Sequence, residues 1–168
     1  MTLKHETHCA ACGAKLITKT HPTDGDIPYC PACDDFRFPG FNTAVSMIVF
    51  NADKSRILLL DQYGKAGILV AGYVSRGDNL EDTVRREVME ETGLAVKDII
   101  FNTSRYYEGS NTLMCNFACV VDADDLRIDT GEVDSARWVP VEDVLNEMLP
   151  HSLAQWFTRV YLDKTGRL

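Results

Sequence analysis

Two pairs of cysteines near the start of the sequence limit how its first forty or so residues can fold. Cys9 and Cys12 stand in "CAAC", and Cys30 and Cys33 stand in "CPAC", with residues 13–29 between the pairs. Each C-x2-C pair offers two sulfurs to one ion, so this spacing predicts a four-thiolate tetrahedral zinc site. Two disulfides are the alternative interpretation of the same four residues.

The predicted zinc site is structural, because four protein thiolates leave no coordination position for water or substrate. We read the N-terminus as lacking a signal-peptide-like apolar run, which favours a cytoplasmic, reducing compartment where thiols stay free or bind metal. The runs "ILLL" and "ILVA" are too short to span a bilayer, so we expect no membrane partner. A zinc ribbon is therefore expected at residues 1–38, where metal binding would supply much of the folding free energy.

A second domain is expected at residues 39–168, beginning at Pro39 and Gly40. The composition, 45% hydrophobic, suffices for a packed core there. Runs rich in Val, Ile and Leu predict strands at 43–50, 56–63, 68–74, 97–107, 113–121 and 135–141. Helices are expected at 79–92, 142–148 and 153–163. Strands gathered in one sheet with helices on its faces predict an α/β or α+β sandwich.

The helix at 79–92 is indicated by a change of apolar period. Leu80, Val84 and Val88 recur every four residues and form one apolar stripe. Asp78 is the expected N-cap, with Glu81 three residues later as in a capping box. Gly93 is the expected C-terminal stop.

Three carboxylates share another face of this helix. Glu87, Glu90 and Glu91 in "RREVMEETG" stand at i, i+3 and i+4, where like charges repel. A divalent cation reverses the sign of that interaction, because Mg²⁺ and Mn²⁺ prefer carboxylate oxygen. Arg86, four residues before Glu90, can pair with it and hold the array. Spacing alone leaves two interpretations, a metal site or a solvated acidic face.

The net charge of −8 argues against a broad nucleic-acid surface, although a local basic pocket is compatible with it. Most of the acidic segment 121–134 is expected to be solvated surface. Cys115 and Cys119 lie in an apolar run without a matching pair, so they are expected to be buried side chains.

The segment "GYVSRGDNLEDTVRREVMEETGL", residues 72–94, resembles the Nudix box, G-x5-E-x7-R-E-U-x-E-E-x-G-U, where U is a bulky apolar residue. Every position fits except Asp78, which stands where the box has glutamate. The resemblance implies a Nudix-like α/β/α sandwich with a mixed sheet. It also implies a hydrolase that uses Mg²⁺ or Mn²⁺ to cleave a nucleoside diphosphate linked to another group.

Carried over position by position, the resemblance implies that Glu87, Glu90 and Glu91 are metal ligands. Glu91 is then the leading candidate for activating water, Gly72 contributes its backbone carbonyl to the metal, and Arg86 orients the glutamates. Asp78 occupies a position whose role in the family is mostly structural.

A four-cysteine ribbon directly ahead of this domain is similar to the NADH pyrophosphatase branch of the family. By that resemblance Tyr73 would stack on a substrate base, and Glu132, in "IDTGEVDSARW", would join the metal site. The branch's S-Q-P-W-P-F-P-x-S-L-M motif is replaced here by "SRYYEGSNTLM", residues 104–114, which leaves the substrate open. Tyr106 and Tyr107 in that segment either contribute to a base pocket or pack as ordinary strand residues.

The resemblance ranks the substrates as NADH or NAD⁺, then ADP-ribose, then FAD, and it implies a homodimer. Two alternative functions follow from the same residues. One is a nucleoside triphosphate pyrophosphatase, which needs a pocket for a single base. The other is a catalytically silent nucleotide-binding regulator, from which loss of helix carboxylates would be expected; all three are present here.

Overall fold

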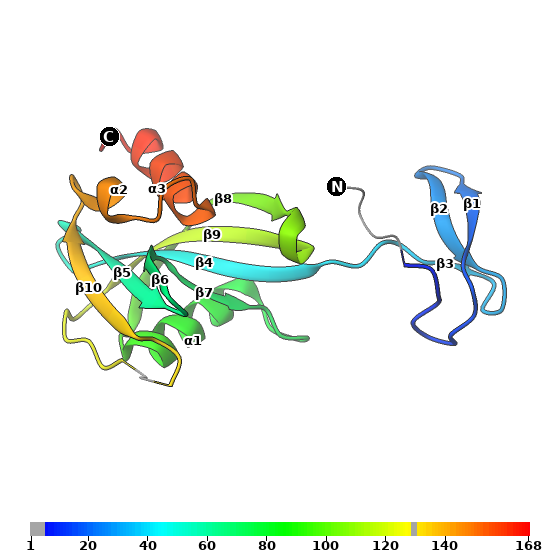
Figure 1. Ribbon diagram of the computed structural model, residues 1–168, viewed down its shortest axis with the longest axis horizontal. Coiled ribbons are helices and arrows are strands. Elements are labelled where there is room, and N and C mark those ends of the chain that lie inside the picture. Colours follow the sequence, from blue (N-terminus) through cyan, green and yellow to red (C-terminus); the bar gives the residue numbers. More distant parts are fainter. Residues whose placement is uncertain (1–5, 129–130) are drawn as a thin grey trace. The chain divides into compact units, whose positions relative to one another are not determined.

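The computed structural model describes residues 6–128 and 131–168 of the chain (Figure 1). The chain divides into two compact units, residues 1–41 and 42–168. Each unit has its own sheet, so each is described by itself.

The first unit is a three-stranded antiparallel sheet of β1 (Ile17–His21), β2 (Gly25–Cys30) and β3 (Asp35–Phe36). Its small core is aromatic, since the Phe36 ring packs edge-on against His21 and Tyr29 at centroid distances of 4.8 and 5.1 Å. Such a core is too small to supply much folding free energy, and Cys9 and Cys30 are buried at its edge.

The second unit is built on a seven-stranded mixed sheet. Its strands are β4 (Asn42–Phe50), β5 (Arg56–Gln62), β6 (Lys65–Ile68), β7 (Val70–Tyr73), β8 (Val96–Tyr107), β9 (Thr112–Val121) and β10 (Ser135–Pro140). The main order is β10-β5-β4-β9-β8, while β6 pairs with β5 and β7 pairs with β4. The pairing of β4 with β9 is parallel, and the other pairings are antiparallel. A short 3-10 helix, η1 (Glu108–Ser110), joins β8 to β9.

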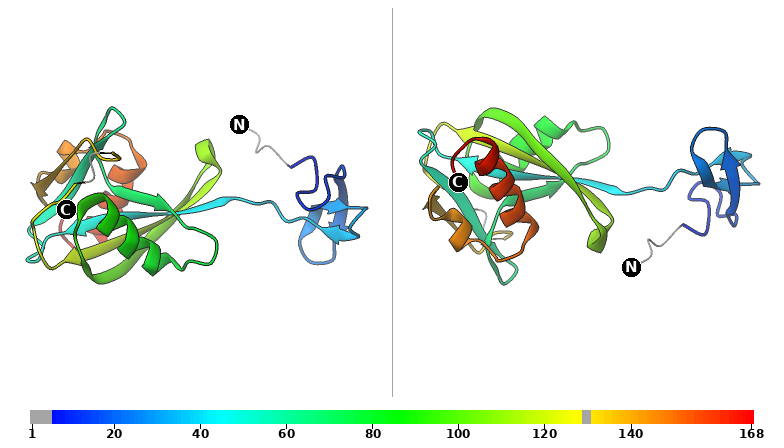
Figure 2. Two further views of the ribbon diagram at one scale, coloured as in Figure 1. Left: turned by 90° about the horizontal axis from the view of Figure 1, so that it is seen from below. Right: turned by 90° about the horizontal axis from the view of Figure 1, so that it is seen from above.

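Helices cover both faces of this sheet, as Figures 1 and 2 show. The helix α1 (Leu80–Thr92) lies on one face, and α2 (Val144–Glu147) and α3 (Leu153–Lys164) lie on the other. The predicted α/β/α sandwich with a mixed sheet is therefore confirmed. None of the helices in the described parts of the chain is long and apolar enough to cross a membrane.

Strict alternation along the central strands produces two apolar layers. The layer beneath α1 includes Val45, Met47, Leu58, Leu60, Val84, Val88, Cys115 and Cys119. The layer beneath α2 and α3 includes Ile48, Phe50, Ile57, Leu59, Val144, Met148 and Leu162. Cys115 and Cys119 are buried, as expected.

Two expected elements differ from the structure. The strand expected at 68–74 is two strands, because the chain leaves the edge of β5 after Ile68 and joins β4 at Val70. Leu69, between them, is buried in the layer beneath α2 and α3. The helix expected at 142–148 is limited to the single turn α2, because residues 140–143 form a turn, with the Asp143 NH bonded to Pro140 O at 3.0 Å, and the backbone is already extended at Met148.

The N-cap of α1 is Asn79, not Asp78. The backbone of Asn79 is extended, its Oδ1 accepts from the Asp82 NH at 2.7 Å, and its Nδ2 donates to Asp82 Oδ2 at 2.7 Å. Both Asp78 with Glu81 and Asn79 with Asp82 have the spacing of a reciprocal cap, and the sequence does not separate them. The C-terminal stop at Gly93 is as expected, with φ of 71° and its NH bonded to Met89 O.

Candidate metal and active site

Gly72 and Glu87 bring strand β7 into contact with the polar face of α1. A Cβ built at Gly72 would overlap the carboxylate of Glu87, so this close approach requires glycine. Gly72 is paired with Val45, on the sheet face that α1 covers. Packing of the apolar stripe of α1 on the sheet therefore positions the carboxylates of this helix against β7.

Arg86 holds several groups of this region together. Its Nη1 lies 2.7 Å from Glu87 Oε1 and 3.0 Å from Glu90 Oε2. Its Nη2 donates to the carbonyl oxygen of Tyr73 at 3.4 Å and lies 3.9 Å from Asp78 Oδ2. One guanidinium thus links the helix carboxylates, the end of β7 and the loop that precedes α1. Asp78 therefore contacts Arg86 and does not serve as the N-cap that the sequence predicted.

Glu91 is the buried member of the carboxylate cluster. Its side chain is 4% exposed, and its Oε2 is a buried side-chain oxygen without a hydrogen-bond partner. Burial, followed in order by the negative charges of Glu87, Glu132 and Glu90, raises the pKa of Glu91 from 4.5 to about 8. An isolated buried carboxylate is costly, so this residue needs a proton or a cation.

Glu132 belongs to the same electrostatic cluster, although it lies forty or so residues further along the chain. Its charge raises the pKa of both Glu87 and Glu91. Glu87 is shifted mainly by burial, and Arg86 opposes that shift. Glu132, in the segment before β10, therefore interacts electrostatically with the helix carboxylates. The sequence could suggest this only through the resemblance.

The donor set fits a divalent cation. It combines carboxylate oxygens, which Mg²⁺ and Mn²⁺ prefer, with a buried oxygen that has no partner and a glycine that leaves space for a carboxylate. A bound cation would remove the mutual repulsion of Glu87, Glu90 and Glu91.

The three predicted aromatic residues are not gathered in one place. Tyr73 follows Gly72 and is 58% exposed, with its side chain on the opposite sheet face because neighbours in a strand alternate. Tyr106 and Tyr107, also exposed, line a cavity of about 780 Å³ between the β8–η1 turn and the start of α3. The described lining of this cavity contains none of the helix glutamates.

Sequence reasoning missed the rest of that cavity. Its wall also contains Arg105, His151, Trp156 and Arg159. These residues come from β8, from the loop before α3 and from α3 itself. The signal that could have found them is weak, because basic and aromatic residues separated by some fifty positions have no spacing that marks a site.

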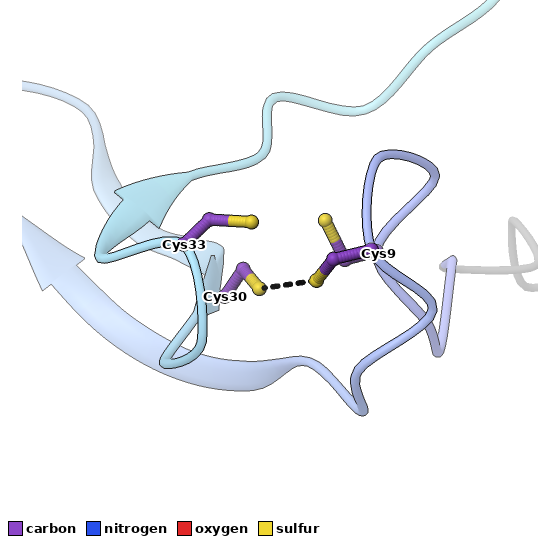
Figure 3. Close-up of side chains that lie close together, drawn as sticks. Cys9, Cys30 and Cys33 are labelled. Atoms are coloured by element: carbon purple, nitrogen blue, oxygen red, sulfur yellow. Dashed lines mark hydrogen bonds between the residues drawn. The ribbon is translucent and has the colours of Figure 1, made fainter.

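The first unit holds a second candidate metal centre. The sulfur atoms of Cys9, Cys12, Cys30 and Cys33 all lie within 4.8 Å of one another. Figure 3 shows the labelled side chains of Cys9, Cys30 and Cys33 pointing toward a common point. Thiolates at about 2.3 Å from a tetrahedral zinc would stand a little under 4 Å apart, so the cluster is compatible with zinc. All six cysteines are free thiols.

Arg37 contacts this cluster directly. Its Nε donates to Cys9 Sγ at 3.2 Å, and this hydrogen bond is the main reason that the pKa of Cys9 falls to about 6. Hydrogen bonds to Cys12 and Cys30 raise the pKa of Cys33 to about 12. The opposite shifts mean that the four sulfurs do not all ionise readily by themselves, whereas a bound cation would favour four thiolates.

These observations define an α/β/α domain in which one helix carries a cluster of carboxylates. A four-cysteine cluster precedes the domain in the sequence. Residues 40–160 match the family model of the NUDIX domain. The chain belongs to the NUDIX family.

A relative described as "NAD-capped RNA hydrolase NudC", from Chromobacterium violaceum, is 28% identical over 138 residues. The match covers 81% of this chain and 52% of the relative. The chain thus spans about half the length of the bacterial relatives it matches.

Two solved structures share the fold. A NUDIX hydrolase from Nitrosomonas europaea has a TM-score of 0.69 at 18% identity, over 96% of this chain and 94% of that one. The NUDIX domain of Shewanella oneidensis NrtR, complexed with ADP ribose, has a TM-score of 0.64 at 19% identity, over 82% and 94%. At these identities the likeness concerns the fold.

Proposed function

We propose that this protein is a divalent-metal-dependent hydrolase that cleaves the diphosphate bond of a nucleoside diphosphate derivative. The observation that carries the proposal is the buried, unpartnered Oε2 of Glu91 among Glu87, Glu90 and Glu132. Burying a carboxylate beside like charges is unfavourable without a cation, and a cation beside a diphosphate is the chemistry of phosphoryl transfer. The family and its "NAD-capped RNA hydrolase" relative support the same class of reaction.

The proposed roles follow from the contacts. Glu87, Glu90, Glu91 and Glu132 would hold the cation together with the carbonyl of Gly72. Bound Mg²⁺ or Mn²⁺ supplies a Lewis acid that neutralises charge on the diphosphate and acidifies the attacking water. Glu91 would also accept the proton from that water, because it is the buried carboxylate of the cluster and its pKa is raised. Arg86 keeps Glu87 and Glu90 oriented.

The substrate ranking stays NADH or NAD⁺ first, then ADP-ribose and FAD, with two monophosphates as products. The printed name of the NudC relative and the ADP-ribose complex of the NrtR domain are both compatible with it. The net charge of −8 disfavours a broad nucleic-acid surface, but NAD at the end of an RNA presents the same diphosphate. NAD-capped RNA therefore belongs among the substrates to be tested.

The decisive experiment is a panel assay of the purified chain with Mg²⁺ and with Mn²⁺. NADH, ADP-ribose, FAD, NAD-capped RNA and the nucleoside triphosphates are incubated separately, and the products are separated by chromatography. We expect a dinucleotide to be cleaved at its diphosphate and Glu91→Gln to lower kcat by at least about a hundredfold. Glu81→Gln, an exposed carboxylate in the first turn of the same helix, is the matched control.

Other outcomes assign the protein differently. Turnover of a triphosphate without turnover of any dinucleotide favours the nucleoside triphosphate pyrophosphatase. Binding of nucleotides with no cleavage of any compound favours the silent regulator. Full activity in Glu91→Gln contradicts the catalytic assignment.

The thiolate cluster is proposed to bind one structural Zn²⁺, and residues 1–38 and 39–168 are proposed as the zinc ribbon and the Nudix domain. We propose a cytoplasmic location, where thiols stay free or bind metal. The homodimer stays a prediction, which sedimentation of the purified protein tests.

A further inference from the structure

Glu132 differs from the other carboxylates of the cluster in what holds it in place. Glu87, Glu90 and Glu91 are spaced by the geometry of α1, whereas Glu132 lies in the segment between β9 and β10. Its charge nevertheless acts on Glu87 and Glu91, so its position matters for the electrostatics of the cluster. A residue outside a helix or strand depends on the contacts of its neighbours for a fixed position.

The chain is attached to the sheet directly after Glu132. Val133 is fully buried in the apolar layer beneath α1. The Asp134 NH donates to Asp61 O at 2.9 Å, and Ser135, the first residue of β10, is paired with Asp61. Asp61, near the end of β5, is therefore the residue against which this part of the chain is placed.

The side chain of Asp61 reinforces that attachment. Its Oδ2 accepts from Ser135 Oγ at 2.7 Å, and its Oδ1 accepts from Arg137 Nη1 at 2.9 Å. Both partners belong to β10, where they stand on the same face of the strand because they are two residues apart. Hydrogen bonds to an ionised carboxylate are stronger than neutral ones, so a single side chain holds the start of β10 at two points.

The same carboxylate stands at an irregularity in the sheet. The register between β5 and β6 shifts between Leu60 and Gln62, and Asp61 Oδ1 accepts from the Gly67 NH at 2.9 Å. The carboxylate thus satisfies a strand NH at the irregularity. Gly67 fits there because its φ is 69° and an added Cβ would overlap the carbonyl oxygen of Glu147. Asp61 therefore joins β5, β6 and β10 at one point.

We propose that Asp61 is a positioning residue for the cation site, which holds Glu132 against the carboxylates of α1 by anchoring the start of β10. Leu60 belongs to the layer beneath α1, so the side chain of Asp61 points to the opposite face of the sheet and does not bind the cation itself. Its effect reaches the site through the backbone of residues 132–135. The inference rests on the proposed function, because it takes Glu132 to be a ligand of the cation.

A double-mutant cycle on the affinity for Mn²⁺ tests the inference. The full chain is titrated calorimetrically with Mn²⁺ as wild type, as Asp61→Ala, as Glu132→Gln and as the double variant. We expect Asp61→Ala to lower the affinity about tenfold in the wild type and to cause no further loss in Glu132→Gln, because it acts through a carboxylate that is already removed there. Equal losses in the two backgrounds, or an unchanged affinity in either single variant, overturn the inference.

Further variants separate positioning from a general loss of stability. Asp61→Asn keeps a side-chain acceptor and should retain part of the affinity for Mn²⁺; it replaces the alanine variant in the cycle if that protein does not fold. Asp124→Asn is the matched control, because it removes an ion pair with Arg56 at the other end of β5. The affinity should stay unchanged in this control. A loss equal to that in Asp61→Ala would contradict a specific role for Asp61.

Hydrogen exchange and hydrolysis then separate this inference from the proposed function. In Asp61→Ala the NH of Asp134 should exchange faster than in the wild type, while protection in β4 and β9 stays unchanged. Non-additive losses of Mn²⁺ affinity without hydrolysis of any dinucleotide support the positioning role and contradict the proposed activity. Hydrolysis together with additive losses supports the activity and overturns the inference. A wild type that binds no Mn²⁺ contradicts both.

Discussion

At the scale of single residues, Glu91 serves the proposed chemistry at a cost to the stability of the fold. Its carboxylate is buried on a helix face with Glu87 and Glu90, and its Oε2 has no hydrogen-bond partner. The free energy of unfolding of a typical domain is only some 5–15 kcal/mol, so one buried carboxylate without a partner changes it appreciably. The cost of an unligated Glu91 should therefore be measurable as a dependence of stability on pH.

The first prediction concerns that dependence. The pKa of Glu91 is about 8 in the folded chain and 4.5 ordinarily, so between these values the folded state holds a proton that the unfolded state has released. In EDTA the free energy of unfolding should therefore fall as the pH rises through this window, by an upper limit on the order of 5 kcal/mol. Chemical denaturation of the wild type and of Glu91→Gln at several pH values measures the difference.

The Glu91→Gln protein lacks the titrating group, so its stability should fall less steeply over the same pH range. Added Mg²⁺ should restore stability to the wild type at the higher pH values and have little effect on the variant. Parallel pH curves for the two proteins would contradict the burial argument.

Gly72 supports a second prediction at this scale. In Gly72→Ala the new methyl group displaces the Glu87 carboxylate, which is the movable end of a side chain. We expect the free energy of unfolding to change by less than about 1 kcal/mol, while the affinity for Mn²⁺ falls at least about tenfold. Calorimetric titration with Mn²⁺ measures the affinity. Gly40→Ala, where a Cβ meets only an ordinary contact with Glu6, is the control.

At the scale of elements, α1 joins the carboxylate face to the core. Val84 and Val88 are fully buried, so the helix cannot rotate without exposing them. Its start is defined by the reciprocal cap between Asn79 and Asp82. Arg86 ties the end of β7, at Tyr73, and the following loop, at Asp78, to the helix.

The cap gives a third prediction. Asn79→Ala should lower the free energy of unfolding by about 1 kcal/mol, because it removes the side chain that accepts from the Asp82 NH. Asp78→Ala removes a partly exposed ion pair at 3.9 Å and should cost only a few tenths of a kcal/mol. Urea denaturation of both variants compares them directly. A larger loss of unfolding free energy in Asp78→Ala than in Asn79→Ala would contradict the assignment of Asn79 as the N-cap.

At the scale of the whole molecule, the two units differ in what stabilises them. The larger unit has an apolar layer on each face of its sheet. The smaller one has a few aromatic contacts and the thiolate cluster. We therefore expect the metal to control the folding of the smaller unit alone.

The fourth prediction follows from that difference. Elemental analysis of protein prepared under reducing conditions should find about one zinc per chain. A strong chelator should remove it and abolish amide-exchange protection in β1 and β2. Both tryptophans, Trp138 and Trp156, lie in the larger unit, so their fluorescence should stay unchanged. Simultaneous loss of the tryptophan signal, or protein that is folded without zinc, would contradict this account.

The sequence by itself determined the local features. Repeated patterns determine helix α1, the apolar strands and the thiolate cluster, because periodicity and spacing are local properties of a chain. The box pattern gave the family and the carboxylates that share one helix face. It left the one-residue choice between Asp78 and Asn79 open, because both have cap chemistry.

Only the tertiary structure decided which distant residues meet. The pairings of β4 with β7 and β9, and of β9 with β8, put Tyr73 and Arg105 in one row of the sheet, and the return of α3 over β8 places Trp156 and Arg159 beside Arg105. The switch of partner strand at Leu69 and the burial of Glu91 likewise depend on neighbours far along the chain. Alternation along a strand tells which side chains share a face, but which distant strands pair is decided by packing between elements.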